Sequence, residues 1–207
     1  MTATTNKVRS MRIGCDNLVW FPLITDDGTT LTYGEPVPLP GLMKVGISTN
    51  SDSGTAFYDN GPGETAATLG NIEVTIDKNA ISTTEQAILL GHTVLDNGVV
   101  VSAANDTPPE GALAYRTLKG NGKYMYVCLL KGSFSEPDEE TETKGDSVNF
   151  QNSSIVGNFS KVNKKFTVSG KTVQHWRTNA DEEDEGSAAI IKKWFESPVL
   201  PDTTAEE

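Results

Sequence analysis

The stretch ALAYRTLKGNGKYMYVCLL, residues 112–130, decides the fold. Two strand candidates, residues 112–118 and 123–130, flank Gly120-Asn121-Gly122, and the Asn-Gly pair favours the tight turn of a β-hairpin. From residue 124 to residue 130, apolar side chains occupy successive positions and therefore both faces of the strand. This pattern predicts a central strand of a sheet that is covered on both sides.

Further strands are predicted on either side of this hairpin. Residues 72–77 alternate apolar and polar side chains, which is the pattern of a half-buried strand. Pro22 interrupts the apolar run 18–24 and predicts a sheet edge or a bend there. A small hairpin is expected around Asp96-Asn97-Gly98. Other strand candidates are residues 29–33, 43–48, 148–162 and 166–177.

Two short helices are expected. Ser82 and Glu85 have capping-box spacing, which predicts a helix over residues 83–90 that ends before Gly91. A second, amphipathic helix is predicted over residues 187–195, with Ala188, Ile191 and Phe195 along one stripe. The predicted fold is therefore mainly β with one or two short α-helices. The β domain is expected over residues 15–197, between an N-terminal arm (1–14) and a C-terminal tail (198–207).

The segment 49–68 has no clear periodicity. It is rich in Ser, Asp, Asn, Gly and Pro around one aromatic pair, Phe57-Tyr58. A stretch of this length without a period is typical of a functional or disordered loop. The aromatic pair at its centre indicates that the loop contacts another surface.

Negative charge is concentrated in two runs. The formal net charge of the 207 residues is -11, from 28 acids and 17 Lys and Arg. Residues 136–142 and 181–185 hold five acids each, so the remaining 18 acids nearly balance the 17 bases. Both runs are ordinary solvated loops on the simplest interpretation. Because such loops repel phosphates, sequence-specific DNA binding is not expected.

Patterns of catalytic or metal chemistry are missing from the sequence. His92 and His175 lie in no zinc-binding spacing, and there is no phosphate-binding loop or nucleophile elbow. The acidic run 181–185 lacks the spacing of a calcium loop. Catalytic residues, metal ligands and cofactors are therefore not predicted.

Cys15 and Cys128 are expected to be free thiols, and no apolar run is long enough for a membrane helix.

The order of these elements resembles that of the major tail proteins, or tail tube proteins, of long non-contractile-tailed bacteriophages (siphophages). The resemblance covers roughly residues 15–177, and no single motif in it is specific. It is carried by Met43-Lys44-Val45-Gly46, the polar loop with Tyr58, the strand at Ile72, and residues 84–91, 115–119, 124–130 and 132–134.

The resemblance implies a tail-tube fold, a β-sandwich or half-barrel, in a structural virion protein. Such subunits form hexameric rings that stack around a tape-measure protein, between tail terminator and distal tail proteins, after assembly in the host cytoplasm. DNA then passes through the lumen of the tail tube without specific binding during ejection. No enzymatic activity, cofactor or membrane contact is implied.

Two sets of candidate site residues follow. The loop is expected to form a ring–ring or subunit interface through Phe57, Tyr58, Asp59 and Asn60. A tube that conducts DNA should not adhere to it, so an acidic segment is expected at the lumen or its rim. The candidates for that role are Glu136, Asp138, Glu139, Glu140 and Glu142.

Other interpretations stay open. A β-sandwich adhesin or carbohydrate-binding module would need exposed aromatic residues on loops, and only Phe57 and Tyr58 fit that requirement. A capsid decoration protein of a phage is also β-rich. An enzyme comes last, because no nucleophile and base can be paired.

Overall fold

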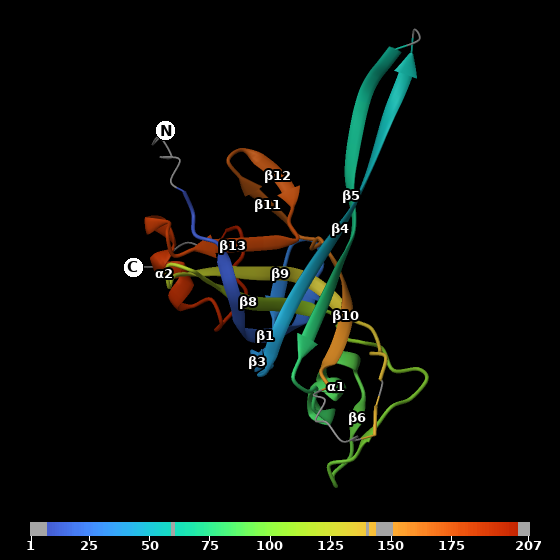
Figure 1. Cartoon of the computed structure of the whole chain (residues 1–207). Helices are drawn as coiled ribbons and strands as arrows, with labels where there is room; N and C mark the ends of the chain where they lie inside the picture. The colour runs from blue at the N-terminus through green and yellow to red at the C-terminus, as the bar shows by residue number, and fades with distance from the viewer. Residues whose placement is uncertain (1–7, 59–60, 140, 144–150, 203–207) are drawn as a thin grey trace.

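The fold is built on one large antiparallel sheet with two short helices (Figure 1). The computed structural model describes residues 8–58, 61–139, 141–143 and 151–202. The strand order is β2-β1-β8-β9-β10-β5-β4, with β3 beside β1 and β13 beside β9. The strands of this sheet are β1 (Arg12–Asp26), β2 (Leu31–Tyr33), β3 (Val37–Pro38), β4 (Leu42–Tyr58), β5 (Gly61–Lys78), β8 (Gly111–Lys119), β9 (Tyr124–Phe134), β10 (Ser153–Ser160) and β13 (Arg177–Asp181).

Two small hairpins and two helical segments complete the described chain. The hairpins pair β6 (Thr93–Val94) with β7 (Val100–Val101) and β11 (Lys165–Val168) with β12 (Lys171–Gln174). The helices are α1 (Thr83–Leu90) and α2 (Ala188–Lys192), and a 3-10 turn η1 (Glu185–Ser187) precedes α2. The predicted mainly β class with two short helices is confirmed.

Strand β9 is covered on both faces, as its sequence predicts. Val127 and Leu129 pack into one hydrophobic cluster, whereas Cys128 and Leu130 pack into a second cluster on the other face. All four side chains are fully buried. The predicted hairpin joins β8 to β9, with Gly122 at a φ of 79°. This hairpin is the centre around which the rest of the sheet is arranged.

The sheet curls toward closure around the first cluster. Its terminal strand β4 approaches β1, where the Cys15 thiol lies 3.6 Å from the Met43 carbonyl oxygen. Between them, the Leu39 amide donates a hydrogen bond of 2.8 Å to the Leu18 carbonyl oxygen. The curled sheet therefore has the form of a half-barrel, with a core of Leu18, Trp20, Leu39, Ile72, Val74, Ile76, Leu113, Val127, Leu129, Phe134, Ile155 and Phe159.

Helix α1 packs against this first cluster, with Leu89 and Leu90 buried in it. The predicted capping box is present: the Glu85 amide donates to Ser82 Oγ at 3.2 Å, and the Ser82 amide donates to Glu85 Oε2 at 2.8 Å. The helix ends at Gly91, whose φ of 77° is left-handed. Lys78, nearly fully buried at the end of β5, pairs with Glu85 and ties the helix to the sheet.

Strand β1 changes partners around Pro22. Val19 and Trp20 pair with β3, whereas Leu23 and the residues after it pair with β2. The bend predicted from Pro22 therefore coincides with a break in pairing within the second strand of the sheet order, not with the sheet edge. The strand begins at Arg12, so its first three residues fall within the predicted N-terminal arm (1–14).

The second helix is shorter than the sequence predicts. Helix α2 covers only Ala188–Lys192. Of the predicted stripe, Ile191 and Phe195 pack against the second hydrophobic cluster, whereas Ala188 is exposed. The main anchor is Trp194, just after the helix, which is 1 % exposed and lies 5.8 Å from the Tyr126 ring. The helix ends before Trp194, so the 3.6-residue period of a helix does not apply to this residue. The turn that follows the helix brings the indole onto the face of β9 that carries the second cluster.

Candidate functional site

The most prominent feature of the molecule is a two-stranded arm, residues 49–58 and 61–71, which projects beyond the rest of the sheet (Figure 1). Strand β5 pairs with β10 only as far as Ile72 opposite Phe159. Beyond that point β4 and β5 pair only with each other, out to Tyr58 opposite Gly61. At about 3.3 Å per residue, some ten residues carry the arm about 30 Å.

The arm corrects the prediction of a loop over residues 49–68. The segment is a continuation of β4 and β5 as a hairpin, with register shifts near Asn50 and Ala56. No third strand of the described chain pairs with it, and its sequence shows no period of two. The strands pair through their backbones, a property that binary patterning does not detect.

The predicted interface residues belong to the outer end of this arm. Phe57 and Tyr58 are the last residues of β4, paired in register with Pro62 and Gly61. Asp59 and Asn60 lie outside the described residues. The expectation that these four residues contact another subunit stays a prediction.

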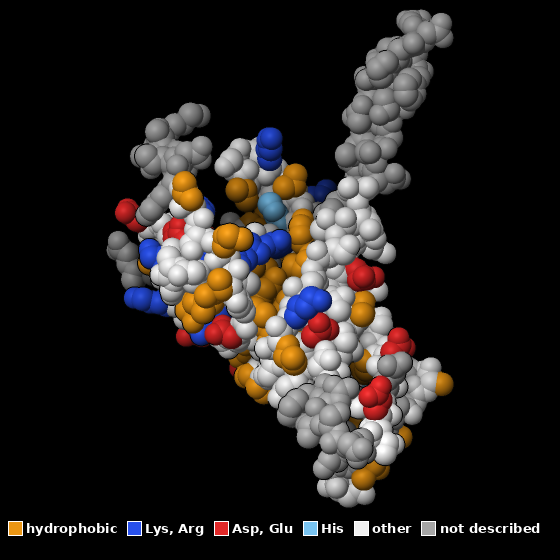
Figure 2. Space-filling view, viewed as in Figure 1, with side chains coloured by type: hydrophobic (Ala, Val, Ile, Leu, Met, Phe, Trp, Pro, Cys, Tyr) orange, Lys and Arg blue, Asp and Glu red, His pale blue; other side chains and the backbone are white. Residues whose placement is uncertain are grey.

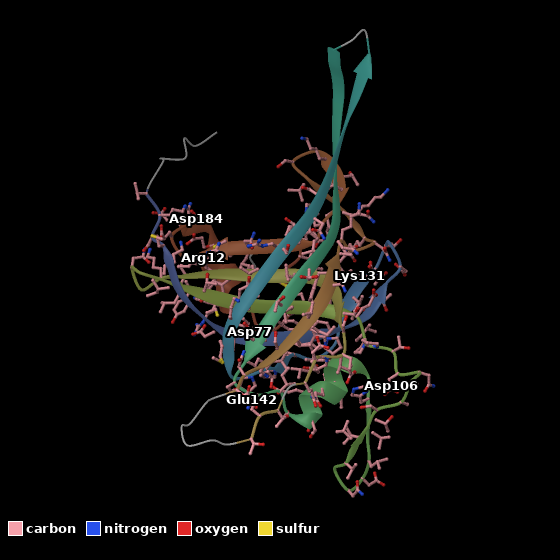
Figure 3. All side chains as sticks on the ribbon, turned by 45° about the vertical axis from the view of Figure 1, so that its right-hand side comes forward. Arg12, Asp77, Asp106, Lys131, Glu142 and Asp184 are labelled. Carbon is pink, nitrogen blue, oxygen red and sulfur yellow. The ribbon has the colours of Figure 1, made fainter. Side chains whose placement is uncertain are left out.

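A second feature is the acidic segment, residues 136–142, near α1 (Figure 3). Glu136, Asp138, Glu139 and Glu142 are exposed, and Glu140 lies outside the described residues. Within the described chain, none of these four carboxylates forms an ion pair with a lysine or arginine. Their negative charge is therefore left uncompensated at the surface.

Two polar contacts fix the segment to the body. The Gln86 side-chain amide on α1 donates to Glu139 Oε1 at 3.1 Å. Glu136 Oε2 lies 3.4 Å from Nε2 of His92, and Nδ1 of the same ring lies 2.8 Å from Asp106 Oδ2. The hydrogen bond from the Ala103 amide, followed by that from His92, lowers the pKa of Asp106. The described residues of the acidic segment are thus held in place without an ion pair to a lysine or arginine of the described chain.

The other acidic run, residues 181–185, is compensated within the subunit. Buried Lys119 pairs with Asp181 and Glu183, and Arg9 pairs with Asp181 at 2.9 Å and Asp184 at 2.7 Å. Burial opposes ionisation of Asp181, but hydrogen bonds from Lys119 and the Glu183 amide outweigh it and lower the pKa of that carboxyl group.

Glu182 also has a structural role. Its carboxylate accepts hydrogen bonds from the Tyr124 amide at 2.8 Å and the Tyr126 hydroxyl at 2.9 Å. The run 181–185 therefore anchors the C-terminal segment to β9, and the simple interpretation of a solvated loop does not hold for it. Sequence alone could not separate the two acidic runs, because their difference lies in Arg9 and Lys119, both distant in the chain.

A groove of about 770 Å³ lies beside this network, between β13, the end of α2 and Arg12. Its one aromatic lining residue is Trp194, whose ring is buried against Tyr126. Stacking on a sugar requires an exposed ring face, so the groove does not supply the feature that the carbohydrate-binding interpretation needs.

The described part of the chain holds no cluster of three or more His, Cys, Asp or Glu side chains placed to bind a metal ion. Both cysteines are free, as predicted, and burial raises the pKa of the Cys128 thiol to about 12. Among the described residues, no helix has the length and apolar character to cross a membrane. No known family model matches the chain, and no curated protein matches it significantly.

Proposed function

We propose that this chain is a structural virion protein, the subunit of a phage tail tube. In this proposal six copies join into a ring, and rings stack around a tape-measure protein between tail terminator and distal tail proteins. DNA passes through the lumen during ejection without specific binding. The proposal also makes the protein non-enzymatic and places it in the virion after assembly in the host cytoplasm.

The single observation that supports this function best is the arm. An isolated two-stranded hairpin is marginally stable in water, and three strands or a packed layer are needed for independent stability. The arm extends about 30 Å past the last strand that supports it. A second subunit that receives the arm would supply the missing layer, and a repeating assembly does so with a single sequence.

The open sheet edge supports the same function. Strand β4 is the last strand of the sheet order, so one row of its backbone groups has no strand beside it in the described chain. Unpaired edges invite pairing with another chain, and closure into a ring removes them. The half-barrel is thus suited to completion by neighbouring copies.

The uncompensated acidic segment fits a DNA-conducting tube. DNA carries about one negative charge per ~1.7 Å of its axis. A negative lumen or rim repels it and lowers the tendency to bind during transit. Glu136, Asp138, Glu139 and Glu142 are exposed and available for this role.

Negative-stain electron microscopy of the purified chain tests the proposal. We expect six-fold rings and long tubes from the intact protein. A variant in which an Asn-Gly turn replaces residues 50–69 should stay folded, by circular dichroism, and form no tubes. A chain that remains monomeric at every concentration and salt condition, or that binds a glycan array as a monomer, would overturn the tail-tube function.

The placement of the acidic segment has its own test. An atomic structure built into a density map of the tube allows the surface potential of its channel to be calculated. A channel lined with positive charge would refute the acidic lumen or rim even if the tubes form as expected.

A further inference from the structure

The hairpin of β11 and β12 carries an unusual concentration of positive charge. Residues 161–174, here called the basic hairpin, contain no acid and four lysines, Lys161, Lys164, Lys165 and Lys171. Lys164 pairs with Asp202 at 3.3 Å and lies over the Phe166 ring. The other three lysines are exposed and form no ion pair within the described residues. Their charge has no partner among the described residues.

The basic hairpin is anchored by a buried side chain at its base, whereas apolar side chains nearer its tip are exposed. Phe166 is 2 % exposed and packs in the second hydrophobic cluster. On the same face, Val168 and Val173 remain 40 % and 46 % exposed. The two strands form a sheet of their own, with no further strand beside them in the described chain. A short sheet with exposed valines and lysines without ion pairs has the composition of a protein–protein interaction surface.

The basic hairpin and the acidic segment lie at opposite ends of the molecule. Figures 1 and 3 show β11–β12 at the end toward which the arm projects, whereas α1, β6 and Glu142 lie at the other end. Figure 2 shows a positive side chain at the top of the β11–β12 hairpin and acidic side chains toward the α1 end. Copies stacked head to tail along the arm would bring unlike charges together.

The acidic end also has a recess whose lining can bind an ammonium group. A polar recess of about 290 Å³, more than a lysine side chain occupies, is lined by Asp138, Glu139, Asn79, Gln86 and Gln151 among others. Carboxylate and amide oxygens are acceptors for an ammonium group.

Exposed apolar side chains accompany this recess, as they do at the basic end. The β6–β7 hairpin follows His92, which contacts Glu136, and carries Val94, Leu95, Val99 and Val101 at 44–51 % exposure. Each end of the molecule therefore combines uncompensated charge of one sign with exposed apolar residues on a small hairpin.

We propose that the basic hairpin of one copy docks on the acidic segment and the β6–β7 hairpin of a second copy in a head-to-tail stack. This inference rests on the proposed tube function and identifies the surfaces through which successive rings recognise each other. It places the acidic segment at the rim of the ring rather than deep in the lumen. The arm projects in the same direction and can contact the next ring. The charge pairing fixes how that ring is aligned.

Charge reversal of each surface tests the proposal. The hairpin variant carries Lys165→Glu and Lys171→Glu, and the segment variant carries Asp138→Lys and Glu139→Lys. A matched control, Lys192→Glu with Lys193→Glu on exposed positions of the α2 region, changes the net charge as the hairpin variant does. Tube length is measured by negative-stain microscopy and sedimentation, with circular dichroism to confirm folding.

We expect intact protein and the control to form long tubes, and each surface variant to give rings or short stacks. An exposed pair contributes about a two- to fivefold change in its contact equilibrium, and the effect multiplies over the copies of a ring. High salt should shorten intact tubes, since the Debye length falls to about 3 Å at 1 M. The two variants mixed together should form tubes again, because acidic and basic rings then alternate.

The outcomes separate the two proposals. If the intact chain never assembles, the tube function fails. If intact protein and both surface variants give tubes of equal length, the tube function stands and the docking of the basic hairpin is wrong. Tubes lost in both variants but not restored in the mixture would also overturn the pairing, because loss without complementation indicates two separate contacts.

Discussion

Strand β9 and the arm belong to the same sheet but are stabilised in opposite ways. Every residue from Tyr126 to Leu130 is buried, and side chains on the two faces enter two different clusters. The arm, by contrast, runs past the last strand that supports it and pairs only with itself. The difference shows that backbone pairing alone extends a strand, whereas stability of the isolated subunit comes from layers on its faces.

The largest expected effect comes from removing a ring at the centre of the body. Phe134 at the end of β9 is 2 % exposed and lies between Trp20 at 5.2 Å and Phe159 at 5.8 Å. Phe134→Ala should lower the free energy of unfolding by about 3–5 kcal/mol. Urea denaturation measures the loss, and the exposed neighbour Val156→Ala is the control, expected within about 0.5 kcal/mol. Similar losses of stability in both variants would contradict the conclusion that the buried core, and not the exposed surface, stabilises the subunit.

A smaller loss is expected from the buried charge network. Lys119→Met leaves Asp181 without its buried cation and should cost about 2–3 kcal/mol, since Asp181 keeps some contact with solvent and with Arg9. Chemical denaturation at pH 7 measures it. Lys192→Met, at an exposed residue, is the control. Equal stability of the two variants would show that the network adds nothing to the body.

The same network predicts how stability depends on pH. The pKa of Asp181 and that of Glu183 are lowered in the folded chain, so their contribution is present above the unfolded values near pH 4 and is lost as pH falls through the folded values. The pKa of Lys119 is raised, so its contribution is lost only as pH rises through the folded value. Lys119→Met should flatten the acid limb of a stability curve measured between pH 3 and 7. An unchanged acid limb would contradict this assignment.

At the boundary of body and helix, Ser82→Ala removes the hydroxyl that caps α1. The expected cost is about 1 kcal/mol, because the Glu85 amide loses its acceptor. Thermal unfolding of Ser82→Ala and Ser82→Gly, measured side by side, tests this cost. Glycine at an N-cap position lowers the free energy of unfolding by only about a few tenths of a kcal/mol. A larger loss for Gly than for Ala would argue against capping as the cause.

The smallest effect on the isolated subunit should come from the arm. Replacing residues 50–69 with an Asn-Gly turn should change the free energy of unfolding by less than about 0.5 kcal/mol, because no other layer of the described chain packs on that hairpin. Urea denaturation at a concentration where the chain is monomeric measures this. A loss comparable to that of Phe134→Ala would show that the arm belongs to the body.

The features predicted correctly from sequence are those whose physical cause is local. The apolar run of β9, the alternation at Ile72, Val74 and Ile76, and the capping box of Ser82 each leave a pattern within a few residues. Each was confirmed because burial on one or both faces, or a helix end, dictates residue types at fixed spacing.

Features that depend on distant partners could not be predicted in this way. The arm pairs with no third strand of the described chain, and residues 49–68 show no period of two that would predict strands. The acidic runs differ only because Arg9 and Lys119 reach one of them. The predicted stripe is correct for Ile191 and Phe195, which pack on the second cluster, but it omits Trp194, which lies beyond the end of the short helix and is the most deeply buried residue there.

Burial of Cys128 makes the labelling rate of its thiol a measure of how often the protein opens. Thiolate is the form that reacts with alkylating reagents, and Cys128 is fully buried with its thiol pKa raised to about 12. It can be labelled only when the second hydrophobic cluster opens on its face of β9. Cys15 is half-buried near the start of β1, where burial raises the pKa of its thiol, and we expect it to react faster than Cys128. Two labelling rates from one sample therefore report surface accessibility and global opening separately, without any engineered probe.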